Sequence, residues 1–187
     1  MAMHADRSDE TLMLEYRDGD VAAFEELYRR HKGGLYRFLL RQSRDAAAAA
    51  EMFQDIWMNL IRARSGYEPT AKFSTYLYRL AHNRLVDQYR KNAHAANVPL
   101  DEDGLEEPAI ARGEEPQAHY ERKALAGRLI ALIEALPPAQ REAFVLQHES
   151  GMSVEEIAAA TGVNRETAKS RLRYAVAKLR SGMSEWR

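Results

Sequence analysis

The sequence predicts an all-α protein of two small helical domains, at 1–93 and 120–187, joined by a flexible acidic linker at 94–119. Apolar residues recur at spacings of three and four through both halves of the 187-residue chain, which is the period of an α-helix. The stretch 97–117 contains three prolines, two glycines and no helical repeat, as expected of a linker. Neither half contains strand periodicity of useful length.

Three helices are predicted in the first half. The first carries a stripe of Phe24, Leu27, Tyr28, His31, Leu35, Phe38 and Leu39, and Gly33 and Gly34 weaken it by about 1 kcal/mol each relative to alanine. The second spans about 46–63, with a stripe of Phe53, Ile56, Trp57, Leu60 and Ile61. The third spans about 73–91, with one face formed by Phe73, Tyr76, Leu77, Leu80 and Arg84. We expect Trp57, Phe73 and Leu80 to be mainly core, and Ser74 or the preceding loop to cap the third helix.

Four helices are predicted in the second half. The first carries a stripe of Leu125, Leu129, Leu132, Ile133 and Leu136. The segment LPPAQRE ends it and begins a helix at 139–149, because proline is tolerated in a first turn but not in a helix interior. Gly151 is expected to terminate that helix. Ser153 and Glu156 have capping-box spacing for a short helix that Gly162 ends, and Asn164 is expected to cap the last helix.

The last two helices, joined through TGVN, form a helix-turn-helix, in which the second helix enters the major groove of DNA. On the second helix a buried stripe is expected from Ala168, Leu172, Ala175, Val176 and Leu179. The opposite, exposed face carries short polar and long basic side chains, which reach base edges and phosphates. The predicted DNA contacts are Arg165, Glu166, Thr167, Lys169, Ser170, Arg171 and Arg173. A helix face that is merely exposed to solvent would explain the charges of the last helix. It would not explain the small residues IAAATG of the preceding helix, the glycine in the turn and the cap, all at the spacing of a helix-turn-helix.

The distribution of charge is more informative than the net charge of −1. Residues 1–93 carry 15 basic and 13 acidic side chains, residues 94–120 carry one and seven, and residues 121–187 carry 11 and eight. Two mildly basic ends therefore flank an acidic middle, and local charge governs contact with phosphates. The chain contains no cysteine, no HExxH-type histidine pair and no membrane-length apolar run. We expect a cytoplasmic protein with no cofactor, no metal, no membrane insertion and no catalytic residue.

The C-terminal half contains the residues from LPPAQRE through YAVAKLR, and the N-terminal half contains the segments FEELYRRHKGGLYRFL, EMFQDIWMNLIRAR and KFSTYLYRLAHNRLVDQYRK. Both halves resemble the extracytoplasmic-function (ECF, group 4) sigma factors of the sigma-70 family. The C-terminal residues are similar to region 4 of these bacterial RNA polymerase subunits, and the three N-terminal segments resemble region 2, in the order of the family. The resemblance implies a promoter-specificity subunit whose region 2 binds the polymerase and opens the −10 element, while region 4 reads the −35 element. No further C-terminal domain is expected.

The resemblance also implies roles for region 2 residues. The helix 46–63 would bind the β′ clamp coiled coil of core RNA polymerase, with surface contacts from Glu51, Gln54, Asp55, Met58 and Arg62. The −10 DNA would be bound and melted by Tyr67, Lys72, Tyr76, Arg79, Asn83 and Arg84. Strand opening requires a base held outside the stack, and aromatic rings with positive charge grip single strands. The loop 65–72 is therefore the candidate pocket for a flipped base.

Further partners implied by the resemblance are promoter DNA, the polymerase β flap and an anti-sigma factor, and the free protein is expected to be a monomer. The sequence departs from the family at Ala48, Ala49 and Ala50, which replace an acidic run. We expect this change to weaken polymerase binding or to require added charge, for example from phosphorylation. The acidic linker either threads through the polymerase near the RNA exit route or is a solubilising spacer.

Two other functions remain open from the sequence. A conventional helix-turn-helix regulator would bind a palindromic duplex without polymerase, whereas a sigma factor binds DNA well only within the holoenzyme. An enzyme would require a phosphate loop, a nucleophile elbow or a metal cluster, and none of these motifs occurs. His31, His82 and His148 fall on predicted helices, where we expect them to be paired or exposed.

Overall fold

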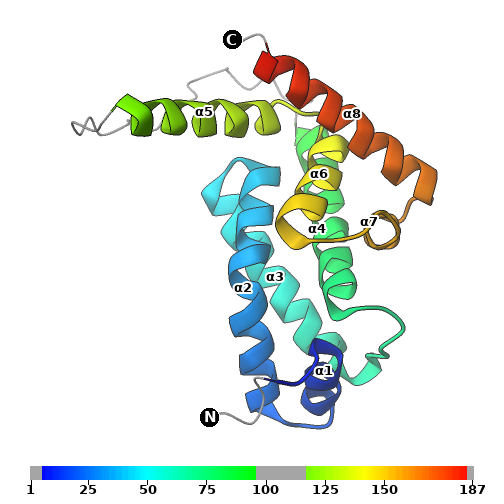
Figure 1. Ribbon diagram of the computed structural model, residues 1–187. Helices are drawn as coiled ribbons and strands as arrows, with labels where there is room; N and C mark the ends of the chain where they lie inside the picture. Colours follow the sequence, from blue (N-terminus) through cyan, green and yellow to red (C-terminus); the bar gives the residue numbers. More distant parts are fainter. Residues whose placement is uncertain (1–5, 96–116, 185–187) are drawn as a thin grey trace.

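The helical prediction is confirmed by the computed structural model, which describes residues 6–95 and 117–184 (Figure 1). The first described part contains α1 (Asp9–Arg17), α2 (Val21–Ser43), α3 (Ala46–Ala63), a short 3-10 turn η1 (Arg64–Gly66) and α4 (Phe73–Ala95). The second contains α5 (Gln117–Glu134), α6 (Pro138–Ser150), α7 (Val154–Thr161) and α8 (Arg165–Ser184). No strand occurs within these two parts. The linker predicted at 94–119 lies mostly outside the described residues, and α4 and α5 extend into both of its ends.

Helix α1 was not predicted. Ser8 caps it by accepting a hydrogen bond from the Thr11 amide, and Leu12, Met13 and Tyr16 are buried against the other helices. Glu10 of this helix accepts a 2.7 Å hydrogen bond from the backbone amide of Phe73, at the start of α4. Of the two expected caps, Ser74 or the preceding loop, Ser74 is wrong because α4 already begins at Phe73, and the Phe73 amide is satisfied by Glu10 of α1.

Helices α2, α3 and α4 form the centre of the N-terminal half, and α1 packs on α2 and α4. Trp57 of α3 is only 4% exposed and contacts Phe24 and Tyr28 of α2, with ring centroids 5.8 and 5.0 Å away. Phe73 is fully buried, whereas Leu80 is half-buried against the core. The expectation that Trp57, Phe73 and Leu80 belong mainly to the core is confirmed, most fully for Trp57 and Phe73.

Local capping shapes the C-terminal half as the sequence predicted. Ser153 and Glu156 form a capping box on α7, with hydrogen bonds of 3.2 and 2.8 Å to the reciprocal amides. Gly151 and Gly162 end α6 and α7 with φ of 65° and 66°, a left-handed conformation that side chains disfavour. Asn164 accepts a 2.8 Å hydrogen bond from the Thr167 amide and so caps α8.

Helix α5 packs mainly on α8 and projects away from the helices of the N-terminal half (Figure 1). Its predicted apolar stripe is buried only at its C-terminal end, at Ile133 and Leu136. Leu125 and Leu129 are 43% and 38% exposed. Periodicity identified the helix but overestimated its buried length, because only the last turns of α5 reach the rest of the core.

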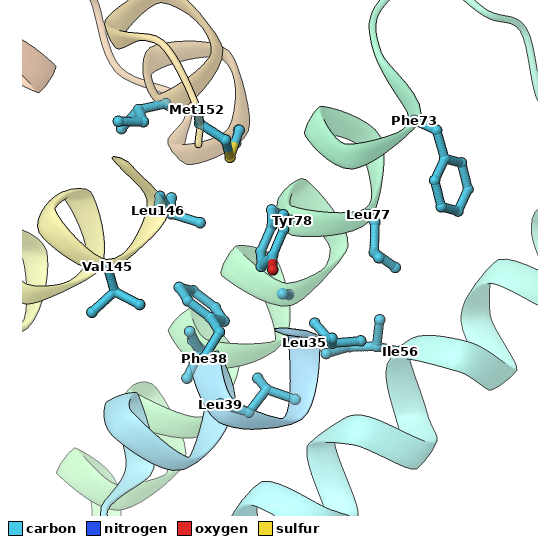
Figure 2. Close-up of a cluster of buried hydrophobic side chains, with 14 of the residues drawn as sticks. Leu35, Phe38, Leu39, Ile56, Phe73, Leu77, Tyr78, Val145, Leu146 and Met152 are labelled. Atoms are coloured by element: carbon cyan, nitrogen blue, oxygen red, sulfur yellow. The ribbon is translucent and has the colours of Figure 1, made fainter. Parts of the chain in front are cut away.

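The two halves pack directly against each other, α6 on α2 and α7 on α4. Figure 2 shows Phe38 of α2 and Tyr78 of α4 facing Val145 and Leu146 of α6, with Met152 beside them. Phe38 and Tyr78 make an edge-on contact with ring centroids 5.2 Å apart. One continuous apolar core therefore serves both halves.

Polar groups surround this contact. Arg141 of α6 is buried and donates from Nη2 to the backbone carbonyl of Gln42 at 3.1 Å and from Nη1 to that of Glu134 at 2.7 Å. His82 of α4 lies 2.9 Å from the Glu142 carboxylate. In the described parts of the chain, no helix is both long and apolar enough to cross a membrane.

Asn164→Ala should lower the free energy of unfolding by about 1 kcal/mol, since it leaves an amide in the first turn of α8 without its cap. Urea denaturation followed by circular dichroism measures this change. Asn164→Asp keeps a side-chain oxygen that can accept this hydrogen bond and should unfold close to the parent midpoint. Equal midpoints for all three proteins would contradict the capping role.

Candidate nucleic-acid and polymerase interfaces

The helix-turn-helix presents the predicted face of α8 to solvent. The predicted buried stripe is confirmed, since Ala168, Leu172, Ala175 and Leu179 are buried and Val176 is half-buried. On the other side Arg165, Glu166, Lys169 and Arg173 are exposed, and Thr167, Ser170 and Arg171 are half-exposed. All seven predicted −35 contacts are therefore at least half-exposed on a single helix.

Two contacts hold basic side chains on this face. Arg165 pairs with Glu155 of α7 and lies 3.2 Å from Glu166, and the hydrogen bond to Glu155 raises the pKa of its guanidinium. The Arg173 guanidinium lies 5.1 Å from the centre of the Tyr174 ring. Tyr174 is 52% exposed and was not among the predicted residues. Its position directly after Arg173 on the exposed side of the helix could have indicated it.

The loop after α3 borders a cavity of about 630 Å³, next to the predicted −10 residues. Its lining combines the loop, the start of α4 and one residue of α7, namely Ala63, Ser65, Gly66, Tyr67, Glu68, Thr70, Ala71, Thr75, Tyr76, Arg79 and Ala159. A second hollow, formed by Arg79, His82, Asn83, Val86, Asp87, Arg90, Ala160, Thr161 and Gly162, lies between α4 and α7. The helix-turn-helix thus contributes a wall to both hollows.

Ser65 and Thr70 of this cavity fall within the predicted loop 65–72 although they were not named, and Thr75 was missed from the sequence. Thr75 is 5% exposed, and among the described residues its hydroxyl has no hydrogen-bond partner. A buried hydroxyl without a partner is unfavourable in the free protein, and a ligand with polar edges can satisfy it. Loop composition alone does not indicate Thr75, because it lies on α4, two residues inside the helix.

The six predicted −10 residues differ in accessibility. Lys72, Arg79 and Asn83 are exposed and Tyr76 is half-buried. Tyr67 is buried and packs on Tyr76 with ring centroids 5.2 Å apart, and burial raises the pKa of its phenol to about 12. The phenol therefore stays neutral at physiological pH. The accessible edge of the site consists of Tyr76 with the Arg79 guanidinium 6.0 Å from its ring.

Arg84 lies against α3. It is 8% exposed and donates hydrogen bonds to Asp55 and Glu51 of α3, at 2.8 and 2.9 Å. A third hydrogen bond, of 3.0 Å, goes to Gln88. Its charge is thus engaged with α3, away from the cavity of the loop.

The predicted polymerase contacts share one accessible side of α3. Glu51, Gln54, Met58 and Arg62 are exposed and Asp55 is half-exposed. In the alanine run, Ala48 and Ala50 are half-exposed, whereas Ala49 is fully buried. An acidic side chain at position 49 would therefore lie in the core. Within this run of three alanines, an accessible negative charge can be introduced only by replacing Ala48 or Ala50.

The histidines that we expected to be paired or exposed make ordinary structural contacts. His31 lies 2.7 Å from Asp9, and this hydrogen bond lowers the pKa of the Asp9 carboxyl despite the opposing effect of burial. His148 stacks on Phe144 with centroids 4.3 Å apart. No group of three or more histidine and acidic side chains suited to a metal ion occurs in the described part of the chain.

Comparison with known proteins matches both halves. Residues 27–95 match the family Sigma-70 region 2, and residues 126–179 match Sigma-70, region 4. The chain is 33% identical over 173 residues to RNA polymerase sigma factor CarQ of Myxococcus xanthus, which covers 92% of this chain and 96% of that protein. It is also 33% identical to ECF RNA polymerase sigma factor RpoE of Cereibacter sphaeroides, over 96% of this chain and 99% of that one.

Solved structures share the fold. CnrH in complex with the cytosolic domain of CnrY has a TM-score of 0.69 at 22% identity and covers 96% of this chain and 99% of that one. The sigma factor RpoE of Bartonella quintana in complex with the anti-sigma factor NepR has a TM-score of 0.68 at 23% identity, and the match covers 88% of this chain and 98% of that one. The chain belongs to the extracytoplasmic-function sigma factors of the sigma-70 family, which direct RNA polymerase to promoters to initiate transcription.

Proposed function

We propose that this sigma factor reads the −35 element with α8, reads and opens the −10 element with the loop 65–72 and the start of α4, and binds the polymerase through α3. The observation that carries this assignment is the accessible basic side of α8, fixed by a buried stripe and an Asn164 cap in a helix-turn-helix. The domain boundaries implied are 1–93 for region 2 and 120–187 for region 4. Reconstitution with core polymerase and mapping of transcription starts tests the proposal, and absence of new starts would overturn it.

At the −35 element, the N-terminal turns of α8 would enter the major groove. Lys169 and Arg173 are four residues apart, so they lie on the same side of the helix. Arginine and lysine donate to guanine edges and phosphates, whereas Thr167 and Ser170 suit shorter-range contacts. Arg165 would exchange its pairing with Glu155 for DNA.

At the −10 element, the cavity beside the loop 65–72 would hold a base taken out of the stack. Tyr76 supplies a ring face, Arg79 supplies positive charge next to that ring, and Thr75 supplies a hydroxyl for the edge of the base. Tyr67 would support Tyr76 from below, as a packing partner. Arg84 would act through α3, by holding Asp55 and Glu51 in place for the polymerase.

The remaining assignments concern partners and location. The β′ clamp coiled coil and the β flap of core polymerase are the proposed protein partners, and α3 offers Gln54, Met58 and Arg62 to the first of these. An anti-sigma factor is a further proposed partner, because one similar solved structure is the sigma factor RpoE in complex with the anti-sigma factor NepR. We propose a cytoplasmic, non-catalytic protein that is monomeric when free.

Lys169→Ala and Arg173→Ala should each lower −35-dependent transcription by about tenfold, corresponding to roughly 1–3 kcal/mol for a specific DNA contact. Run-off transcription with reconstituted holoenzyme measures the effect, and affinity for core polymerase should not change. Lys178→Ala is the matched control, since it removes an exposed positive charge from the later turns of α8. Loss from all three variants alike would assign the effect to overall charge.

Thr75→Val should reduce promoter opening while leaving the free protein at least as stable. The substitution keeps the branched shape and removes a hydroxyl that lacks a partner in the free protein, which is nearly neutral for folding. Permanganate reactivity of thymines in the −10 region measures opening, and thermal unfolding measures stability. If the Thr75→Val variant opens the promoter as well as the parent protein does, Thr75 is not part of the proposed site.

Ala48→Asp with Ala50→Glu should raise the affinity for core polymerase, because it restores acids at the two accessible positions of the alanine run. Fluorescence titration of labelled sigma factor with core enzyme measures the change. Ala48→Gln with Ala50→Gln adds polar side chains without charge and serves as control. No gain over this control would show that the alanine run does not limit binding.

A further inference from the structure

Helix α1 contacts the backbone of the loop 65–72 and its end at two places. The Glu10 carboxylate accepts a hydrogen bond of 2.7 Å from the Phe73 amide, directly after the loop. Within the loop, the Tyr67 carbonyl accepts a hydrogen bond of 3.4 Å from Nη1 of Arg17. Because both partners are main-chain atoms, these contacts constrain the course of the loop and not only the position of its side chains.

A third contact lies just before the loop. The guanidinium of Arg64 lies 5.1 Å from the centre of the Tyr16 ring, and its Nη1 is 3.4 Å from the Tyr16 hydroxyl. Tyr16 is only 4% exposed, so its ring gives Arg64 a fixed surface. Helix α1 therefore contacts the chain before, within and after the loop, beside η1 and the start of α4 (Figure 1).

Helix α1 is itself fixed to the centre of the N-terminal half. Asp9, the neighbour of Glu10, lies 2.8 Å from Nη1 of Arg30 and 2.7 Å from Nε2 of His31, both on α2. The His31 ring in turn lies 5.1 Å from the ring of Phe73, where α4 begins. The contacts of α1 therefore attach the loop to the packed helices α2 and α4.

Two backbone hydrogen bonds in and next to the loop are local. The Tyr67 amide donates to the Arg64 carbonyl at 3.1 Å, and the Thr70 amide donates to the Glu68 carbonyl at 2.9 Å. These bonds span three residues or fewer, so they form turns and do not attach the loop to the helices beside it. A loop that is held in place before binding loses less conformational entropy when it takes up a ligand, and it therefore binds that ligand more readily.

We propose that α1 is a positioning element of the −10 site, in which Glu10, Tyr16 and Arg17 hold the loop 65–72 ready to receive an unstacked base. These three residues thereby set the rate of promoter opening while acting on DNA only through the loop. The proposal rests on the proposed function, which assigns the loop to the −10 element. Helix α1 precedes residues 27–95, the part of the chain that matches Sigma-70 region 2, so the family match does not itself assign this role.

The rate of promoter opening tests the positioning role in the reconstituted holoenzyme. A 2-aminopurine base placed in the −10 element of a promoter found by mapping transcription starts emits more strongly when it leaves the stack, and stopped-flow fluorescence gives the rate constant. Glu10→Ala should lower this constant roughly three- to tenfold, as expected from one lost hydrogen bond, and Arg17→Met should lower it as well. Affinity for the promoter before opening should not change. A parental rate constant for Glu10→Ala would overturn the proposal.

Conservative variants separate positioning from a loss of folding. Glu10→Gln keeps a side-chain oxygen that can accept the hydrogen bond of the Phe73 amide, and it should open the promoter at nearly the parental rate. Glu25→Ala removes an exposed carboxylate from α2 and serves as the matched control, with a parental rate expected. At saturating holoenzyme the rate constant does not depend on the folded fraction, so a merely unstable variant would not lower it. Opening by Glu10→Gln as slow as that by Glu10→Ala would overturn the role of this hydrogen bond.

Hydrogen exchange tests the contact in the free chain, without reference to transcription. Amide exchange followed by mass spectrometry reports local opening of the backbone. Glu10→Ala should speed exchange of the peptide that covers residues 65–73, while peptides from α3 and α8 should exchange as in the parent protein. Unchanged exchange of residues 65–73 would overturn the proposal. Uniformly faster exchange throughout the chain would overturn it too, because α1 would then act on overall stability.

Tyr76→Ala distinguishes this inference from the proposed function. Tyr76 belongs to the proposed −10 site itself, so its loss should slow opening independently of α1. A parental rate of opening by Tyr76→Ala would overturn the proposed −10 site, and the positioning role with it. Slow opening by Tyr76→Ala together with parental opening by Glu10→Ala would overturn only the positioning role of α1.

Discussion

The packing of Phe38 and Tyr78 against Leu146 is the interaction on which the rest of the structure depends. Each half alone contributes fewer than 100 residues, and small domains bury a limited fraction of their apolar surface. Joining α6 to α2 and α7 to α4 makes a single continuous core. The position of the helix-turn-helix, and hence the lining of both hollows, follows from this contact.

The same interface combines apolar burial with a ring of polar pairs, and these two components have different consequences. Apolar contacts hold the two halves together without specifying which side of α7 meets α4. The pairs of Lys72, His82 and Arg41 with carboxylates fix the orientation, although solvent-exposed pairs add little stability.

The small residues of α7 serve two purposes in this arrangement. Ala158 and Ala160 are buried and let α7 approach its neighbours closely, as a helix-turn-helix requires. Ala159 and Gly162 face hollows beside α4 and leave space there. A side chain larger than alanine at position 159 would narrow the cavity that Ala159 lines beside α4.

The sequence by itself determined the described α-helices other than α1, the caps of α7 and α8, and the family, because periodicity, Ser153, Asn164 and the glycines act over a few residues. It also determined which side of α8 is buried. Only the tertiary structure decided that α1 supplies Glu10 to the start of α4, that Arg84 joins α3, that Tyr67 is buried and that Thr75 lacks a partner. It likewise decided that the two predicted domains share a core. These features depend on contacts between residues from about 30 to more than 100 positions apart, which no local pattern encodes.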